Sequence, residues 1–154
     1  MSKEYFLRKF MDEIWNKKDF EKVQEYVHKE YTIHLDTADP WEGKTLNHSE
    51  FKERLKFSFN SFPDMNFEIT SAIPEENHVA ITWILTGTNL GMIGGYPPTE
   101  KSINTKGMTI VLIWNQNGIG IKWNSNSETT GSGVSKKIGM SMERKILCLK
   151  FYPN

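Results

Sequence analysis

The hydrophobic pattern of this 154-residue chain changes period at Phe62-Pro63-Asp64. Before this point apolar residues recur at the spacing of an amphipathic helix, as at Phe51, Leu55 and Phe59. After it, in residues 67–73, they alternate with polar residues, which is the spacing of a strand with one buried face. A chain whose helices precede its strands is expected to form an α+β fold, with the helices on one face of a mostly antiparallel sheet.

The last helix before the change of period has the clearest local signal. Asn47 can accept a hydrogen bond from the next turn, and Glu50 stands at the third helical position, from which it can reach back to form a capping box. Two shorter helices are expected before it. One is predicted from the apolar spacing of residues 6–14, and the other from Asp19, a candidate N-cap, with an end near residue 27.

Strands are expected mainly in the second half of the chain. The dipeptide Asn117-Gly118 predicts a tight hairpin, and the glycines and prolines of residues 88–101 predict a loop. The predicted strands are residues 31–36, 67–73, 78–87, 103–115 and 119–126.

Composition excludes several classes of protein. The 19 basic and 19 acidic side chains balance, whereas nucleic-acid binders usually carry a basic excess. Cys148 is the only cysteine, so no intramolecular disulfide can form, and the four histidines lack the spacing of a metal site. No apolar run approaches the roughly 20 residues of a membrane span, and the charged N-terminus is unlike a secretory signal. We expect a cytoplasmic protein without metal or organic cofactor, and without a nucleic-acid or membrane partner.

A few side chains are candidates for a ligand site. Trp83 and Trp123 fall on the apolar faces of their predicted strands, although most buried tryptophans serve only as core. His34 shares a strand face with Thr32 and Asp36. That polar face can line a cavity or meet solvent, and the alternation does not decide between the two.

Several phrases of the sequence occur in the order seen in SnoaL-like proteins, and the chain resembles the polyketide-cyclase branch of the nuclear-transport-factor-2-like (NTF2-like) superfamily over residues 5–139. The phrases are Trp15-Asn16 with Asp19, His34, Phe62-Pro63-Asp64-Met65, Gly87-Thr88-Asn89-Leu90-Gly91, Gly95-Tyr96-Pro97-Pro98-Thr99 and Ile121-Lys122-Trp123.

The resemblance implies an NTF2-like cone, in which N-terminal helices pack on a strongly curved sheet and enclose an apolar cavity, usually in a homodimer. The domain is expected to span residues 1–139, and residues 140–154 are a C-terminal extension that can be an added strand or a packing arm. The expected ligand-binding residues are Trp15, Phe51, Phe62, Trp83, Met92, Tyr96 and Trp123.

The sequence departs from the family where the resemblance implies catalysis. Asn89 stands where the family commonly has His in Gly-Thr-His, and Ser127 stands where it commonly has the acid/base Asp of Trp-x-x-x-Asp. No Asp follows Asp64 anywhere in the chain. Glu128 is adjacent, but strand alternation points it to the other face unless a bulge intervenes. The predicted catalytic set is therefore His34, Asn89 and Ser127, with His34 as proton shuttle and Asn89 as donor to an enolate-like oxygen.

Two functions follow from the resemblance and its departures. The first is a cyclase- or isomerase-type enzyme that uses acid/base chemistry on a small apolar carbonyl compound. The second is a non-catalytic protein that holds a hydrophobic small molecule in the same cavity. A third reading, a dimerisation module with a collapsed cavity, needs no ligand.

Overall fold

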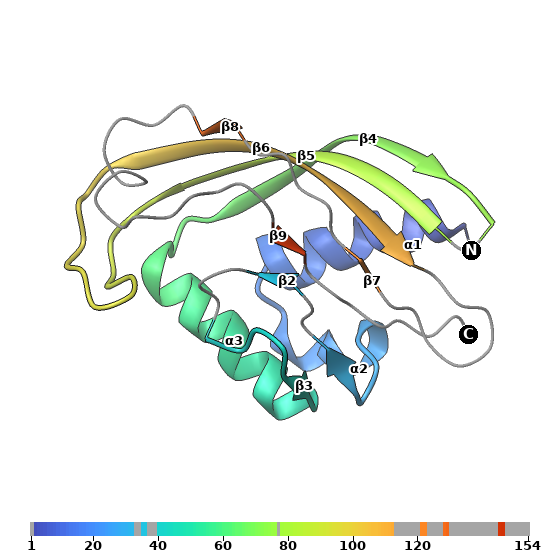
Figure 1. Cartoon of the computed structure of the whole chain (residues 1–154), viewed down its shortest axis with the longest axis horizontal. Coiled ribbons are helices and arrows are strands. Elements are labelled where there is room, and N and C mark those ends of the chain that lie inside the picture. The colour runs from blue at the N-terminus through green and yellow to red at the C-terminus, as the bar shows by residue number, and fades with distance from the viewer. Residues whose placement is uncertain are drawn as a thin grey trace.

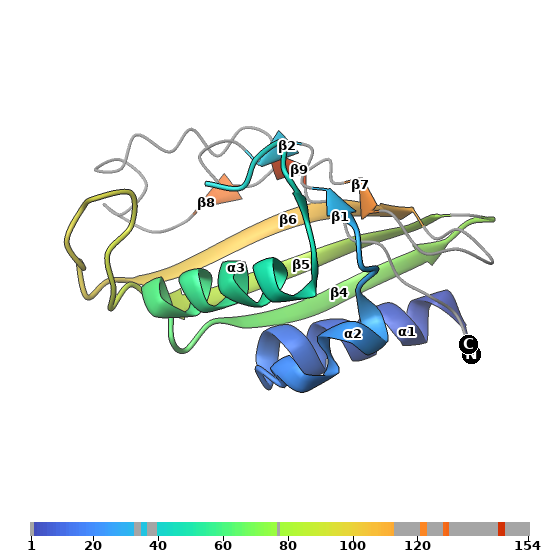
Figure 2. The ribbon, with the colours of Figure 1, turned by 90° about the horizontal axis from the view of Figure 1, so that it is seen from below.

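The computed structural model describes residues 2–32, 35–36, 40–76, 78–112, 121–122, 128–129 and 145–146. Within this part the chain is an α+β fold, as predicted: a curled antiparallel sheet arches over a layer of helices, which lie on its concave side (Figures 1 and 2). The helical segments are α1 (Lys3–Phe10), the π-helix η1 (Met11–Asn16), the 3-10 turn η2 (Phe20–Lys22), α2 (Val23–Tyr26) and α3 (His48–Ser61).

The main sheet has the order β4-β5-β6-β7, and β8 also pairs with β6. Its strands β4, β5 and β6 confirm the three long strands predicted from alternation, and a register shift between Ile69 and Ser71 bends β4. The predicted Asn117-Gly118 turn lies outside the described residues. The sheet consists of β4 (Asn66–Pro74), β5 (His78–Thr88), β6 (Ser102–Leu112), β7 (Ile121–Lys122) and β8 (Glu128–Thr129).

The predicted strand at residues 31–36 is replaced by two short strands with different partners. β1 (Tyr31–Thr32) pairs with β3 (Thr45–Leu46), and β2 (Leu35–Asp36) pairs with β9 (Lys145–Ile146). β9 belongs to the expected C-terminal extension, so this segment adds a strand beside the N-terminal half of the chain. Strand alternation shows the period of a segment but not which distant segment pairs with it.

The capping box at the start of α3 is confirmed. The Asn47 Oδ1 accepts from the Glu50 backbone N–H at 3.0 Å, and Glu50 Oε2 accepts from the Asn47 N–H at 2.8 Å. The helix then buries Phe51, Leu55 and Phe59, the stripe that the helical spacing predicts. These contacts fix where α3 begins and which of its sides faces the sheet.

Alternation along the two central strands separates an inner from an outer face. On β6 the side chains of Ile103 and Thr105 are buried, whereas those of Lys106 and Met108 are exposed. On β5 the inner residues Val79, Ile81 and Trp83 are buried in the same way. The inner face of the sheet therefore packs against the helices.

Candidate functional site

Aromatic side chains connect the helical layer to the inner face of the sheet. The rings of Trp15 and Phe67 lie 5.5 Å apart, those of Phe67 and Trp83 lie 5.6 Å apart, and both pairs meet edge to face. Phe59 of α3 contacts Trp15 at 6.0 Å in the same geometry. We call these four residues the aromatic row. Each such pair contributes roughly 1 kcal/mol beyond its buried area.

Two polar atoms at this face are buried without a hydrogen-bond partner in the described part of the chain. They are the Trp15 Nε1, which can only donate, and the Thr105 Oγ1, which can donate and accept. The residues are 5% and 3% exposed, so bulk water does not hydrate these atoms freely. Because most buried polar groups in folded proteins are hydrogen-bonded, such atoms require an explanation.

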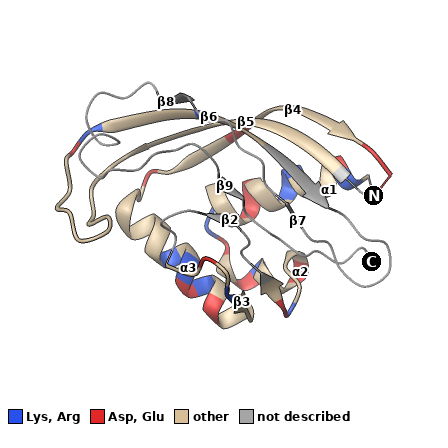
Figure 3. Cartoon of the chain, in the orientation of Figure 1, with Lys and Arg blue, Asp and Glu red and all other residues tan. Residues whose placement is uncertain are grey.

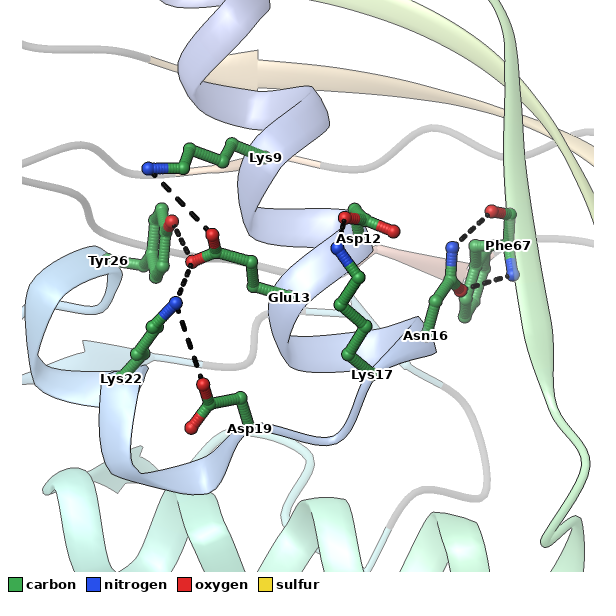
Figure 4. Close-up of polar contacts among 9 residues, drawn as sticks. All are labelled: Lys9, Asp12, Glu13, Asn16, Lys17, Asp19, Lys22, Tyr26 and Phe67. Atoms are coloured by element: carbon green, nitrogen blue, oxygen red, sulfur yellow. Dashed lines mark hydrogen bonds and ion pairs between the residues drawn. The ribbon is translucent and has the colours of Figure 1, made fainter.

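Asn16 holds the aromatic row in place. Its Nδ2 donates to the Phe67 carbonyl at 2.9 Å, and its Oδ1 accepts from the Phe67 backbone N–H at 2.7 Å (Figure 4). It lies at the end of η1, whose wider turn is marked by the bond from the Lys17 N–H to the Asp12 carbonyl. In the Trp15-Asn16 phrase, the Trp15 ring thus contacts the Phe67 ring while the Asn16 side chain binds the Phe67 backbone.

Replacing Asn16 with Asp is expected to lower the free energy of unfolding by about 1–2 kcal/mol, because a carboxylate cannot donate to the Phe67 carbonyl. Urea denaturation measures the change. Asn66→Asp, at an exposed position of the same strand β4, is the matched control and should cost much less. Equal losses in the two variants would contradict a clamping role for Asn16.

The phrases Phe62-Pro63-Asp64 and Gly87-Thr88 meet in space. Asp64 Oδ1 accepts from the Thr88 backbone N–H at 2.6 Å, and its Oδ2 accepts from the Thr88 hydroxyl at 2.7 Å. These bonds hold the pKa of Asp64 below its ordinary range. The two phrases therefore connect the end of α3 to the end of β5, and these hydrogen bonds stabilise the fold.

Asn89 supports the loop between β5 and β6. It is 1% exposed, and its Nδ2 donates to the carbonyls of Gly91 at 2.8 Å and Ser61 at 3.4 Å. Its Oδ1 accepts from the backbone N–H of Thr99 at 2.9 Å and from the Thr99 hydroxyl at 3.0 Å. Donation to a ligand would require Asn89 to give up one of these bonds, so its predicted catalytic role stays a prediction.

The predicted ligand-binding residues fall into three groups. Trp15 and Trp83 are buried and are brought together through Phe67. Phe51 is also buried but contacts Tyr31, and Phe62 is partly buried against the core. Met92 and Tyr96 are 58% and 50% exposed on the loop after β5.

Three predicted residues, His34, Ser127 and Trp123, lie outside the described residues. Phe67 and Thr105 were not predicted as site residues, although their inward position follows from strand alternation. Glu128 is the register partner of Lys106, a residue of the outer face. Ligand contact by His34, Ser127 and Trp123 stays a prediction.

Glu13 is a buried carboxylate that was not predicted. Its side chain is 12% exposed, accepts a hydrogen bond from the Tyr26 hydroxyl, and lies 3.3 Å from the Lys22 Nζ and 3.8 Å from the Lys9 Nζ (Figure 4). The Tyr26 hydrogen bond lowers the Glu13 pKa, burial opposes this, and the lysines lower it further. The pKa of Tyr26 is raised by burial and by Glu13. Glu13 is therefore ionised at neutral pH and is a poor general acid.

This network predicts a loss of stability in acid. Because the folded pKa of Glu13 lies below its ordinary value of 4.5, its stabilising effect is complete above that value and disappears as pH falls through the folded pKa. Glu13→Gln should lower the free energy of unfolding by about 2 kcal/mol at neutral pH and flatten its decline between about pH 5 and pH 3. Urea denaturation across this range measures both effects.

Glu53→Gln is the control for that experiment, because Glu53 is exposed and pairs with Lys56 on the same helix. This variant should keep the wild-type decline in acid, since its Glu13 network is intact. An unchanged acid profile in Glu13→Gln would contradict the assignment.

The described residues contain neither a cluster of metal-binding side chains nor a helix that could span a membrane. No group of three or more His, Cys, Asp or Glu side chains there has the arrangement of a metal site. No helix in that part of the chain has the length and apolar character needed to span a membrane.

The chain belongs to the SnoaL-like polyketide cyclase family, whose sequence model matches residues 6–123. A proposed polyketide cyclase from Acidithiobacillus ferrooxidans is 30% identical, with a TM-score of 0.69 over 92% of this chain and 99% of that one. IdmH, a proposed polyketide cyclase from Streptomyces antibioticus, is 20% identical, with a TM-score of 0.62 over 89% of this chain and 98% of that one. No curated protein sequence matches the chain.

Proposed function

We propose that this protein is a cyclase- or isomerase-type enzyme that binds a small apolar carbonyl compound against the inner face of its sheet. The observation that carries the proposal is the aromatic row, which brings four rings together beside two buried polar atoms without partners in the described residues, Trp15 Nε1 and Thr105 Oγ1. Membership of the SnoaL-like polyketide cyclase family supports the reaction class.

The proposed chemistry needs no redox step. A base removes a proton from the carbon next to a carbonyl. In a cyclase the resulting enolate carbon attacks a second carbonyl. In an isomerase the enolate takes up a proton at a different carbon. In a ring closure the new alkoxide takes up a proton, so the proton count balances. His34 is proposed as the proton shuttle because imidazole exchanges protons near neutral pH. Asp is absent at the family's acid/base position, where the sequence has Ser127.

A simple ketone tests this activity. With 2-acetylnaphthalene in D₂O, the enzyme should speed the exchange of the methyl protons for deuterium, measured as loss of the methyl ¹H NMR signal. His34→Ala should remove the acceleration while leaving binding of the ketone unchanged. His48→Ala is the control, because His48 Nε2 is 2.6 Å from the Val27 carbonyl and serves the start of α3. Exchange that is unchanged in His34→Ala would contradict the shuttle.

A non-catalytic binding protein is the second candidate. Two observations favour it. Hydrogen bonds within the protein already engage both the Nδ2 and the Oδ1 of Asn89, and Ser127 stands where the family commonly has Asp. Both residues are at positions where the resemblance implies catalysis. This function predicts saturable binding of the ketone without any exchange of its methyl protons. Native mass spectrometry of the purified protein would then reveal a retained small molecule.

We also propose that two copies associate through the outer face of the sheet. Met108 and Ile73 are 41% and 63% exposed, and Ile84 is partly buried on the neighbouring strand. The charged residues gather mostly on the helices rather than on β4, β5 and β6 (Figure 3). Light scattering should give a dimer for the wild type and a monomer for Ile84→Lys.

A cytoplasmic location stays a prediction.

A further inference from the structure

Thr105 lies on the inner face of the sheet, near the start of β6. It is the register partner of Leu85 on β5 and stands two residues before Gly107, which pairs with Trp83. Its side chain is on the buried side of β6, and the residue is 3% exposed. Thr105 is therefore the inner-face neighbour of Gly107, the position that lies under the Trp83 ring.

The hydroxyl of Thr105 has no evident role in holding the fold together. Its Oγ1 is buried and finds no hydrogen-bond partner among the residues that the structure describes. By contrast, the hydroxyls of Ser61, Thr88 and Thr99 donate to Met92, Asp64 and Asn89 respectively. Burial of a hydroxyl without a partner costs free energy, and Val would fill the same space in a strand without this cost.

Thr105 lies next to aromatic rings on the inner face of the sheet. The six-membered ring of Trp83 lies against the backbone of β6 at Gly107, with Phe67 at its edge. A planar apolar molecule that packs on these rings would bring its substituents near the neighbouring position on β6. A hydroxyl there can donate to a carbonyl oxygen or accept from a ligand hydroxyl.

We propose that the Thr105 hydroxyl binds an oxygen of the ligand and selects oxygenated planar compounds over hydrocarbons of the same shape. This inference rests on the proposed function, because it requires the inner face to be the ligand site. Thr105 thus determines specificity and takes no part in proton transfer.

The test compares two probes of similar shape, 2-acetylnaphthalene and 2-isopropylnaphthalene, which differ in the carbonyl oxygen. Dissociation constants are measured by tryptophan fluorescence quenching for the wild type, Thr105→Val, Thr105→Ser and Thr86→Val. Thr86→Val makes the same change on the partner strand β5, at a partly buried position that alternates with the inner-face residues. Thermal unfolding establishes that each variant is folded.

In Thr105→Val the affinity for the ketone should fall about fivefold, the usual effect of one neutral hydrogen bond, while the affinity for the hydrocarbon is nearly unchanged. Thr105→Ser and Thr86→Val should keep the wild-type preference for the ketone. A purely structural hydroxyl would affect both probes alike, so the ratio of the two affinities separates recognition from packing.

The other outcomes overturn the inference, and each of them points to a different cause. If the wild type binds both probes and Thr105→Val keeps the wild-type ratio, the ligand site stands and the role of Thr105 is wrong. If Thr105→Val weakens both probes equally, the hydroxyl acts through packing and recognises no ligand oxygen. If neither probe binds the wild type, the proposed ligand site fails, and the inference fails with it.

Discussion

Replacing Gly91 with alanine is expected to lower the free energy of unfolding by about 3 kcal/mol, among the largest effects of a single added methyl group. A Cβ at this position would stand 1.9 Å from the Asn60 carbonyl oxygen and 2.7 Å from its carbonyl carbon. Because both atoms are backbone at the end of α3, no side-chain rotation can relieve the overlap. The loop would have to leave the helix.

The same substitution should also disrupt the bonds that tie this loop down. The backbone N–H groups of Leu90 and Gly91 both donate to the Ser61 carbonyl, at 3.1 and 3.2 Å. Urea denaturation of Gly91→Ala measures the stability, and Leu90→Ala, at a 52% exposed neighbour, is the control. A loss below about 1 kcal/mol in Gly91→Ala, or an equal loss in both variants, would contradict the close contact.

Replacing Gly107 with alanine is expected to cost about 2–3 kcal/mol and to change the environment of a tryptophan. A Cβ there would stand 2.2 Å from the Trp83 Cζ2 and 2.5 Å from its Cη2, so the ring must move away from the sheet. Displacing this ring also removes the surface on which the proposed ligand packs. Near-ultraviolet circular dichroism and urea denaturation measure the two effects, and ketone affinity should fall with them.

A double-mutant cycle identifies the cause of that loss. In a Trp83→Leu background the ring that meets the new Cβ is gone, so Gly107→Ala should cost much less than in the wild type. The difference between the two costs is the interaction between the ring and the added methyl group. Additive losses would show instead that Gly107 is required for a backbone reason unrelated to Trp83.

The local elements of the fold follow closely from the sequence. The capping box at Asn47 and Glu50 and the alternation along β5 each depend on residues near in the chain. The separation of β1 from β2 could not be predicted, because it depends on which distant strands, β3 and β9, pair with them. Strand pairing is decided by contacts between segments, which spacing alone does not contain.

The candidate site could be predicted only in part, for a similar reason. Trp83 was expected on an inner strand face, and the structure places it in the aromatic row. Asn89 was interpreted from its position in a family motif, whereas its actual partners are carbonyls and a threonine of the nearby loop and helix end. Sequence motifs show which residues matter, but the bonds they make depend on the tertiary arrangement.

The proposed ligand site is the inner face of the sheet, beside the aromatic row. Its most direct test follows the indole N–H signals in a ¹H–¹⁵N NMR titration with 2-acetylnaphthalene, assigned through Trp→Phe variants. Trp41 is the internal control, because its ring packs on the ring of Phe57. Phe57 is two residues after Leu55 and therefore lies on the opposite side of α3. Binding at the inner face should give saturable shifts of the Trp15 and Trp83 signals, with the Trp41 signal unmoved. Shifts confined to Trp41, or none at saturating ketone, would contradict it.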